Sequence, residues 1–396
     1  MKILLINKFH HIRGGSDTYY FTLADLLRQK GHEVIFFSMQ HEDNFPCKQS
    51  GYFVPKVEYR GKQTLFQQLR AGFKFVYSRN SRKRICKLLD NEKPDIAHVN
   101  LVHRQLTFSI IDELYARHIP IVYTIHDHIC LCPNCTFLSH GSLCEDCLQK
   151  HSFGPCVIHS CVKESKLKSI LAYIEAVFLN ATDKYNKIDL YIAPSRFISQ
   201  EHQKSGFTRS KILFLRNFLP YDTEFLAAPQ YHGYLLFLGR LSAEKGILTL
   251  LEAMKQGPDI QLQIAGDGPL RKEIDTFIQA NTLNERVKML GFQQKEAMQD
   301  IISRCKAVVA PSEWYENCPY SIMEAQAKGK PVIGTNIGGI PELIEDGETG
   351  FIAEPQNASS LAQALHRLAA MDQTAYQFMC DKAASFARQN YGYEYY

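Results

Sequence analysis

Two glutamates separated by seven residues, Glu316 and Glu324, are the first candidates for chemistry in this chain. Glu316 lies in a polar and aromatic stretch, and Glu324 lies in the run Tyr320–Lys328, which is helical in character and is closed by Gly329. Carboxylates bind the hydroxyls of ribose or of a sugar as bidentate acceptors. Because such a spacing is common by chance, the elements around the two glutamates must decide its meaning.

Those elements predict a βαβ unit. Ala307–Ala310 is a short apolar run expected to be a buried strand of a parallel sheet, and Lys330–Gly334 is expected to be the next strand. In such sheets ligands lie at the carboxyl ends of strands, beside helix N-termini. Backbone N–H groups near the start of the helix would face an anion. The predicted ligand-binding residues in the loop are Asn317, Cys318, Pro319 and Tyr320.

Two cations follow an earlier predicted strand, Tyr234–Leu238. Arg240 and Lys245 precede the predicted helix Ile247–Lys255. Cations at the N-terminal side of a helix, with the helix dipole behind them, suit a pyrophosphate group. The alternative is that they are two solvated cations on a turn.

The whole run from Glu316 to Gly350-Phe351, with E-N-C-P, S-I-M-E-A and G-K-P-V-I, closely resembles glycosyltransferase family 4, retaining enzymes of the E-x7-E type. The segment L-G-R-L-x-x-E-K-G is similar to that family too. The resemblance implies an α/β fold of the GT-B type, with two facing Rossmann-like doubly wound domains and an interdomain cleft. The alternative is an ordinary βαβ unit with two solvated glutamates.

The same resemblance implies sugar transfer from a nucleotide-diphosphate donor to an acceptor hydroxyl, with retention and with the leaving phosphate acting as base. It places Glu316 on the sugar, Glu324 on the ribose, and Arg240 and Lys245 on the diphosphate. Because these cations neutralise the leaving group, no cofactor is expected to be required for catalysis.

The N-terminal half begins with a similar unit: a strand at Lys2–Ile6, a helix at Asp17–Lys30 and a strand at Glu33–Phe37. Gly14 and Gly15 lie between the first strand and the helix. Their backbone amides could approach a phosphate or the bound sugar, or the glycines could serve only a tight turn. The order G-G-S-D also resembles the family, with Asp17 where Glu is more usual. No G-x-G-x-x-G is present, which disfavours a nicotinamide cofactor.

His126 follows another predicted strand, Pro120–Ile125, at its carboxyl end. In the family a histidine at this place contacts the donor sugar, so the resemblance makes His126 a catalytic candidate. The alternative is a hydrogen-bonded structural histidine.

The composition fits a globular protein of two domains. The 396 residues are 45% hydrophobic and 22% charged. We expect an N-terminal, acceptor-side domain at 1–218 and a C-terminal, nucleotide-sugar-binding domain at 219–396. Residues 1–200 hold 26 Lys and Arg against 18 Asp and Glu. This excess suggests an anionic surface or acceptor, or it is incidental surface charge.

No signal sequence and no apolar run long enough to span a membrane is found, so we expect a cytoplasmic protein. The stretch Tyr59–Lys87 interleaves basic residues with apolar and aromatic ones at helical spacing. This pattern suits peripheral contact with an anionic membrane, such as the inner face of the plasma membrane. A helix that packs on the sheet would explain it equally well, and no nucleic-acid-binding module is present.

Twelve cysteines are present, and seven of them fall between Cys130 and Cys161. Cys132, Cys135, Cys144 and Cys147 have the paired spacing of a structural zinc site, in an insertion at 130–161. Some relatives in the family carry a similar cysteine pattern here, which makes Cys161 an alternate ligand for Cys135. Free thiols or disulfides are the alternative.

The predicted function is therefore a retaining glycosyltransferase with a carbohydrate or lipid-linked acceptor, in the biosynthesis of a cell-surface polysaccharide or glycolipid. Two other classes stay open: a nucleotide-sugar epimerase of related two-domain fold, and a non-catalytic partner protein that binds nucleotide sugars.

Overall fold

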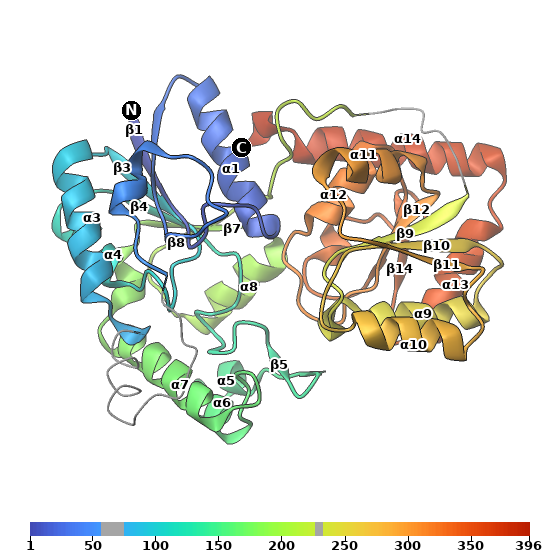
Figure 1. The fold of residues 1–396 in the computed structure, drawn as a ribbon, viewed down its shortest axis with the longest axis horizontal. Helices are drawn as coiled ribbons and strands as arrows, with labels where there is room; N and C mark the ends of the chain where they lie inside the picture. Colours follow the sequence, from blue (N-terminus) through green and yellow to red (C-terminus); the bar gives the residue numbers. More distant parts are fainter. Residues whose placement is uncertain (57–74, 226–232) are drawn as a thin grey trace. The chain divides into compact units, whose positions relative to one another are not determined.

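The computed structural model describes residues 1–56, 75–225 and 233–396, and the chain divides into two compact units, Met1–Leu215 and Arg216–Tyr396 (Figure 1). Each unit is built on one parallel six-stranded sheet. Most of the predicted basic and aromatic segment Tyr59–Lys87 falls at 57–74, outside the described residues. None of the helices in the described ranges is both long and apolar enough to cross a membrane.

The sheet of the first unit has the strand order β2-β1-β3-β4-β7-β8. Its strands are short and mostly buried, as expected of a parallel sheet covered on both faces. They are β1 (Lys2–Ile6), β2 (Glu33–Phe37), β3 (Ile96–Val99), β4 (Ile121–Thr124), β7 (Leu190–Ala193) and β8 (Lys211–Phe214). The first strand lies between β2 and β3, so the strand order reverses beside it. Ligands bind at such a reversal in doubly wound sheets.

The helices of this unit are α1 (Gly15–Gln29), α3 (Arg79–Glu92), α4 (Ser109–Ala116), α7 (Lys166–Ala181) and α8 (Arg196–Ser205). Three of them begin with a serine whose hydroxyl accepts a backbone N–H of the first turn: Ser78, Ser165 and Ser195. This is the cap that satisfies an otherwise unpaired donor at a helix start.

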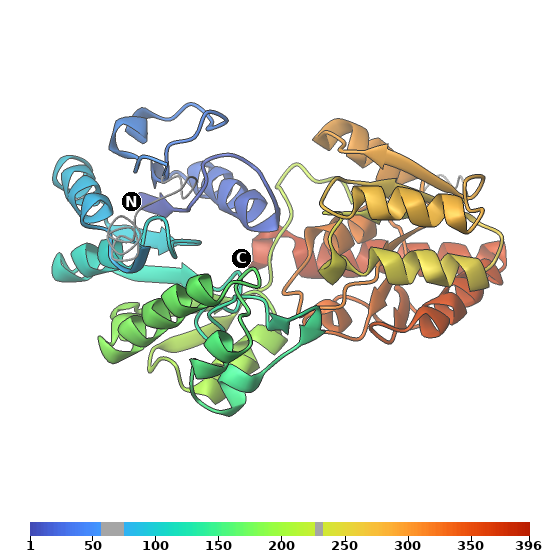
Figure 2. The same ribbon diagram turned by 60° about the horizontal axis from the view of Figure 1, so that its bottom comes forward.

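The cysteine segment lies between β4 and α7. It contains a small hairpin of β5 (Leu138–Ser139) and β6 (Ser142–Leu143), followed by the short helices α5 (Asp146–Gln149) and α6 (Gly154–Ile158), drawn in teal to green in Figures 1 and 2. Gly141 turns the hairpin at a φ of +79°, a conformation that side-chain-bearing residues rarely adopt.

The sheet of the second unit has the order β11-β10-β9-β12-β13-β14. The strands are β9 (Tyr234–Leu238), β10 (Gln261–Ala265), β11 (Val287–Gly291), β12 (Ala307–Ala310), β13 (Val332–Thr335) and β14 (Gly350–Ala353). Here β9 lies between β10 and β12, so the reversal falls between β9 and β12. The strand β14 was not predicted, because Gly350-Phe351 was considered only as the last two residues of the sequence motif.

Helices cover both faces of this second sheet (Figure 1). One face carries α9 (Ile247–Gln256), α10 (Arg271–Ala280) and α13 (Ala358–Ala369), and the other carries α11 (Lys295–Arg304), α12 (Tyr320–Ala327) and α14 (Gln373–Tyr391). Apolar side chains from the sheet and from α9, α10, α13 and α14 form one buried core. The core holds β9 and β12 in place, and their carboxyl ends carry the predicted site residues.

Candidate functional site

Glu316 lies in the loop between β12 and α12 and is only 8% exposed. Its Oε1 accepts hydrogen bonds from the Nζ of Lys245 at 2.5 Å and from the Oγ of Ser312 at 3.0 Å. Burial alone would raise the pKa of Glu316, but the Lys245 ammonium and the hydrogen bonds outweigh it and hold the pKa below its usual range. The loop therefore carries an ionised, nearly buried carboxylate.

Lys245 reaches this carboxylate from the segment between β9 and α9, and its Nζ also lies 5.4 Å from the centroid of the Trp314 ring. The approach depends on Gly246, which has a φ of +67°. A Cβ at Gly246 would come within 1.8 Å of the carbonyl oxygen of Pro311. The glycine thus allows the turn after β9 to contact the loop after β12.

Arg240 is exposed at the carboxyl end of β9. Within the described residues its guanidinium makes no hydrogen bond or ion pair, so its charge is available to a ligand. Lys245 and Glu316 are thus brought together by the fold, whereas Arg240 lies at the same strand end without joining them.

Glu324 lies on α12, one turn into the helix. Burial raises the pKa of Glu324 to about 7, and Lys295 opposes this only in part. The two predicted glutamates therefore differ in charge at neutral pH: Glu316 is ionised and Glu324 is about half protonated. This difference was not foreseen from the sequence, where the two carboxylates look alike.

The rest of the loop is fixed by backbone contacts. Gly339 donates its N–H to the carbonyl oxygen of Glu316 at 2.7 Å, and Asn217 donates its side-chain amide to that of Cys318 at 3.2 Å. Burial raises the pKa of the Cys318 thiol to about 12, so this thiol is not a nucleophile at neutral pH. Pro319 is the N-cap of α12.

Tyr320, the first residue of α12, donates its hydroxyl hydrogen to the carbonyl oxygen of Phe218 at 3.2 Å. Asn317 is partly buried in the same loop. The loop from Glu316 to Tyr320 is therefore held against the second unit by its own backbone and side chains, which positions the carboxylate of Glu316 independently of any ligand.

In the first unit, Gly14 is the N-cap of α1 and Gly15 is its first residue. Gly14 has an extended φ of −176°, and a Cβ there would meet no atom within 4 Å. The backbone does not need a glycine at this position. Open space above a helix start is compatible with the close approach of a ligand. Asp17 is buried and accepts hydrogen bonds from the side chain of Asn7 and the backbone N–H of Arg13, which fixes the loop before α1.

His126 follows β4, and its Nε2 lies 2.8 Å from the Oδ1 of Asn100. The amide nitrogen of Asn100 donates to the carbonyl oxygen of Ile6, so its oxygen faces the histidine, and Nε2 carries the hydrogen. Burial lowers the pKa of His126 to about 3. His126 is therefore a neutral imidazole whose Nδ1 keeps its lone pair as a hydrogen-bond acceptor.

The predicted zinc ligands do not all gather in one place. Among the described residues, Cys132, Cys135, Cys144 and Cys147 do not form a group with sulfurs at ligand spacing. Cys135, at a φ of +61°, lies beside Asp127 and Arg104, whereas Cys144 lies with Asp146 and His159, all three within 4.8 Å of one another. Cys135 and Cys144, one from each predicted pair, therefore lie in different surroundings, which the spacing along the chain could not reveal.

A different set of thiols converges instead. Cys132, Cys147, Cys156 and Cys161 lie within electrostatic range of one another, and the last three pack in one small apolar cluster. Burial raises the pKa of Cys147 to about 12. Cys161 was an alternate in the prediction, and Cys156 was missed because it belongs to no C-x2-C pair.

Comparison with known proteins identifies the family of this chain. Residues 13–222 match the family model described as Glycosyltransferase Family 4, and residues 223–385 match the model described as Glycosyl transferases group 1. The first match covers more than half of the chain. The chain belongs to glycosyltransferase family 4.

Two curated relatives of this family member are transferases by name. Alpha-D-kanosaminyltransferase of Streptomyces kanamyceticus is 37% identical over 137 residues, which cover 34% of this chain and 35% of that protein. The 2-deoxystreptamine N-acetyl-D-glucosaminyltransferase of Niallia circulans is 28% identical over 228 residues, 55% of this chain and 56% of that protein. The chain thus spans about one third to a little over one half of the length of these relatives.

Solved structures match nearly the whole chain. Sucrose-phosphate synthase from Thermosynechococcus elongatus has a TM-score of 0.69 at 19% identity, covering 99% of this chain and 95% of that one. Anabaena HepE in complex with UDP and glucose has a TM-score of 0.65 at 19% identity, with the same coverage. These likenesses confirm the predicted GT-B fold class.

Proposed function

We propose that this family 4 member transfers a sugar from a nucleotide-diphosphate donor to an acceptor hydroxyl with retention at the anomeric carbon. The observation that carries the proposal is the pairing of Lys245 with Glu316 at the carboxyl ends of β9 and β12, where the strand order reverses. Doubly wound sheets bind nucleotides at this point.

The donor residues have distinct roles in this proposal. Arg240 and Lys245 receive the diphosphate, whose negative charge grows as the glycosidic bond breaks. Glu316 accepts hydrogen bonds from the sugar hydroxyls, and its position at the loop supports this, because Lys245 and Ser312 occupy only one of its two oxygens. Glu324 accepts the ribose hydroxyls as a carboxylate.

A metal ion is not needed at the diphosphate in this mechanism, because two cationic side chains supply the charge. Breaking the glycosidic bond leaves the electron pair on the diphosphate oxygen. That oxygen takes the proton of the attacking acceptor hydroxyl on the same face of the sugar, which retains the configuration.

The first unit contributes the acceptor side. The neutral His126 offers Nδ1 to a sugar hydroxyl, and the amides at Gly14 and Gly15 offer hydrogens at the start of α1. The acceptor is a carbohydrate or a lipid-linked carbohydrate, and the pathway is the biosynthesis of a cell-surface polysaccharide or glycolipid. Relatives named for colanic acid and amylovoran biosynthesis support this choice. The protein would then work in the cytoplasm, in peripheral contact with the inner face of the plasma membrane through the basic segment.

The cysteine segment would hold a structural zinc ion. Burial raises the pKa of the Cys132 thiol, and the backbone N–H groups of Phe137, Asn134 and Thr136 oppose this only in part. The convergence of Cys147, Cys156 and Cys161 supports a ligand set in which Cys156 and Cys161 replace Cys135 and Cys144. The four sulfurs would draw closer together on binding the ion.

The test is an incubation of the purified chain with a panel of nucleotide sugars and no acceptor. A transferase releases free sugar slowly, and Glu316→Gln should reduce this release. An isomerised donor would instead indicate an epimerase, and neither product with any donor would indicate a silent binding protein. Adding candidate glycan or lipid-linked acceptors to the active donor then identifies the acceptor.

A further inference from the structure

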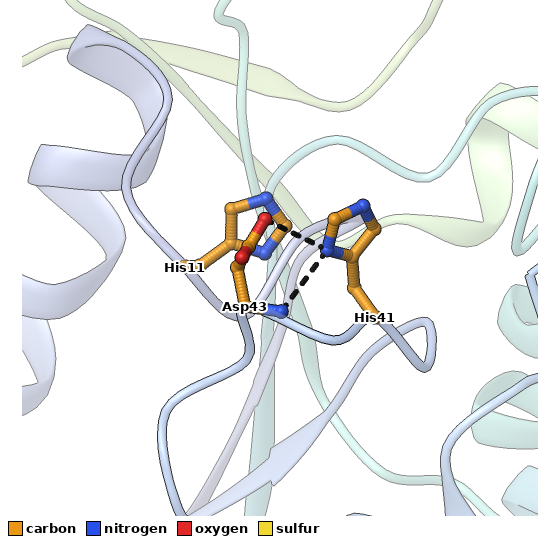
Figure 3. Close-up of side chains that lie close together, drawn as sticks. All are labelled: His11, His41 and Asp43. Atoms are coloured by element: carbon orange, nitrogen blue, oxygen red, sulfur yellow. Dashed lines mark hydrogen bonds and ion pairs between the residues drawn. The ribbon is translucent and has the colours of Figure 1, made fainter.

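Three possible metal ligands, His11, His41 and Asp43, lie together on two loops of the first unit (Figure 3). Because β1 and β2 are neighbouring parallel strands, the loops that follow them start at the same edge of the sheet. His11 belongs to the loop after β1, and His41 and Asp43 belong to the loop after β2. One ring nitrogen of each histidine and one carboxylate oxygen all lie within 4.8 Å of one another.

The backbone holds these two loops together. Phe45 donates its N–H to the carbonyl oxygen of His10 at 2.9 Å, and Met39 donates to that of Lys8 at 3.3 Å. Asn44 donates its N–H to the carbonyl oxygen of His41 at 3.3 Å, which closes a turn that carries Asp43. The grouping of the three side chains is therefore built into the loops.

Asn44 fixes the tautomer of His11. The side-chain nitrogen of Asn44 donates to the carbonyl oxygen of Met39 at 2.8 Å, so its Oδ1 is the atom that lies 3.1 Å from Nδ1 of His11. Nδ1 must carry the hydrogen, and Nε2 is left with a lone pair. Metal-binding histidines have this arrangement, in which the second ring nitrogen donates to a fixed oxygen. His11 is only 7% exposed, so its orientation is well restrained.

The carboxylate of Asp43 lies beside one ring nitrogen of His41. The backbone N–H of Asp43 donates to the Nδ1 of His41 at 3.2 Å. The carboxylate Oδ2 of Asp43 also lies 3.2 Å from this Nδ1 (Figure 3). The backbone N–H and the carboxylate of Asp43 therefore both face the Nδ1 edge of His41, which holds the carboxylate oxygen beside the imidazole.

We propose that His11, His41 and Asp43 bind a divalent transition-metal ion, for which Zn²⁺ is the best match. Two imidazoles and one carboxylate are a ligand set that zinc accepts, at about 2.0–2.2 Å from each atom, with water completing the coordination. The side chain of Asp43 is 67% exposed and that of His41 is 16% exposed, so the ion can enter from solvent on the Asp43 side.

The bound ion would join the loop after β1 to the loop after β2. The loop after β1 leads directly to Gly14 and the start of α1, so the ion would restrain the part of the first unit that carries these glycines. Its role is to order this edge of the sheet, and its ligands include neither the diphosphate-binding residues nor the cysteines.

The test is binding of Zn²⁺ and of Co²⁺ to the full chain by titration calorimetry and absorption. The main variant is Asp43→Asn, because this exposed side chain can change without disturbing packing. Glu42→Gln is the matched control, since it removes one charge from an exposed residue of the same turn. Cobalt bound by nitrogen and oxygen lacks the strong sulfur charge-transfer absorption of thiolate sites, which separates this ion from one held by the cysteines.

We expect one non-thiolate ion per wild-type chain, with affinity reduced at least about 10-fold in Asp43→Asn and unchanged in Glu42→Gln. Asn44→Ala should also weaken binding, by about 10- to 100-fold, because it releases the tautomer of His11. Equal non-thiolate binding by Asp43→Asn and wild type would overturn the proposal. So would the absence of such binding in the wild type.

Discussion

The protonation of Glu324 gives the sharpest test of the donor site. Burial raises the pKa of Glu324 to about 7, because Lys295 offsets the cost of burying the charge only in part. If only the carboxylate form binds the ribose hydroxyls, affinity follows the ionised fraction. That fraction is about one tenth at pH 6 and about nine tenths at pH 8, because each pH unit away from the pKa changes the ratio tenfold. Donor affinity should therefore rise about 10-fold over this range.

The assay is calorimetry with an intact nucleotide sugar, whose phosphates do not titrate in this range, whereas a terminal phosphate has a pKa of about 6. Glu324→Gln is the matched variant, with the same shape and no titration. We expect it to bind the donor about 10- to 100-fold more weakly than wild type at pH 8, with little dependence on pH. A wild-type affinity that is flat from pH 6 to pH 8, or one that falls, would refute the reasoning.

The remaining predictions concern the other site residues and the stability of each unit. Glu316→Gln should lower turnover about 10- to 100-fold with a smaller effect on donor affinity; steady-state kinetics that match the wild type would remove Glu316 from the site. Lys245→Met should lower the melting temperature, because it leaves the Glu316 carboxylate unpaired. The expected cost is about 1–3 kcal/mol after allowance for the partial exposure of Lys245. The double variant Lys245→Met with Glu316→Gln should recover most of this loss. Arg240→Ala should reduce turnover about 10²–10³-fold with an unchanged melting temperature, because the side chain is exposed; a large loss of stability would show that Arg240 has a structural role instead. The first unit should lose stability as the pH falls below about 6.5. Burial lowers the pKa of His98 and His10 to about 4 and the pKa of His126 and His202 to about 3. The unfolded chain therefore takes up protons at a higher pH than the folded chain does, which favours unfolding. Thermal melts from pH 7 to pH 4.5 measure this loss, and His202→Gln should reduce the slope if the variant folds.

The sequence determined the elements and the edge of the sheet on which the site would lie. Apolar runs such as Tyr234–Leu238 and Ala307–Ala310 match β9 and β12 at both ends, because a short apolar run bounded by polar or glycine residues has few other ways to be buried. The helix after each strand was equally visible from its spacing. These are local properties, and local rules place Arg240, Lys245 and Glu316 at strand ends without knowledge of the fold.

The pairing of side chains was decided only by the tertiary structure. Lys245 and Glu316 are 71 residues apart and meet because β9 and β12 are neighbours in the sheet, a strand order that no local pattern contains. The pKa of Glu324 depends on what covers α12. Likewise Cys156, which the spacing did not single out, packs with Cys147 and Cys161, and His11 meets His41 because β1 and β2 are paired. Sequence spacing predicts which residues share an element, whereas packing between elements determines which of them touch and what charge each one carries.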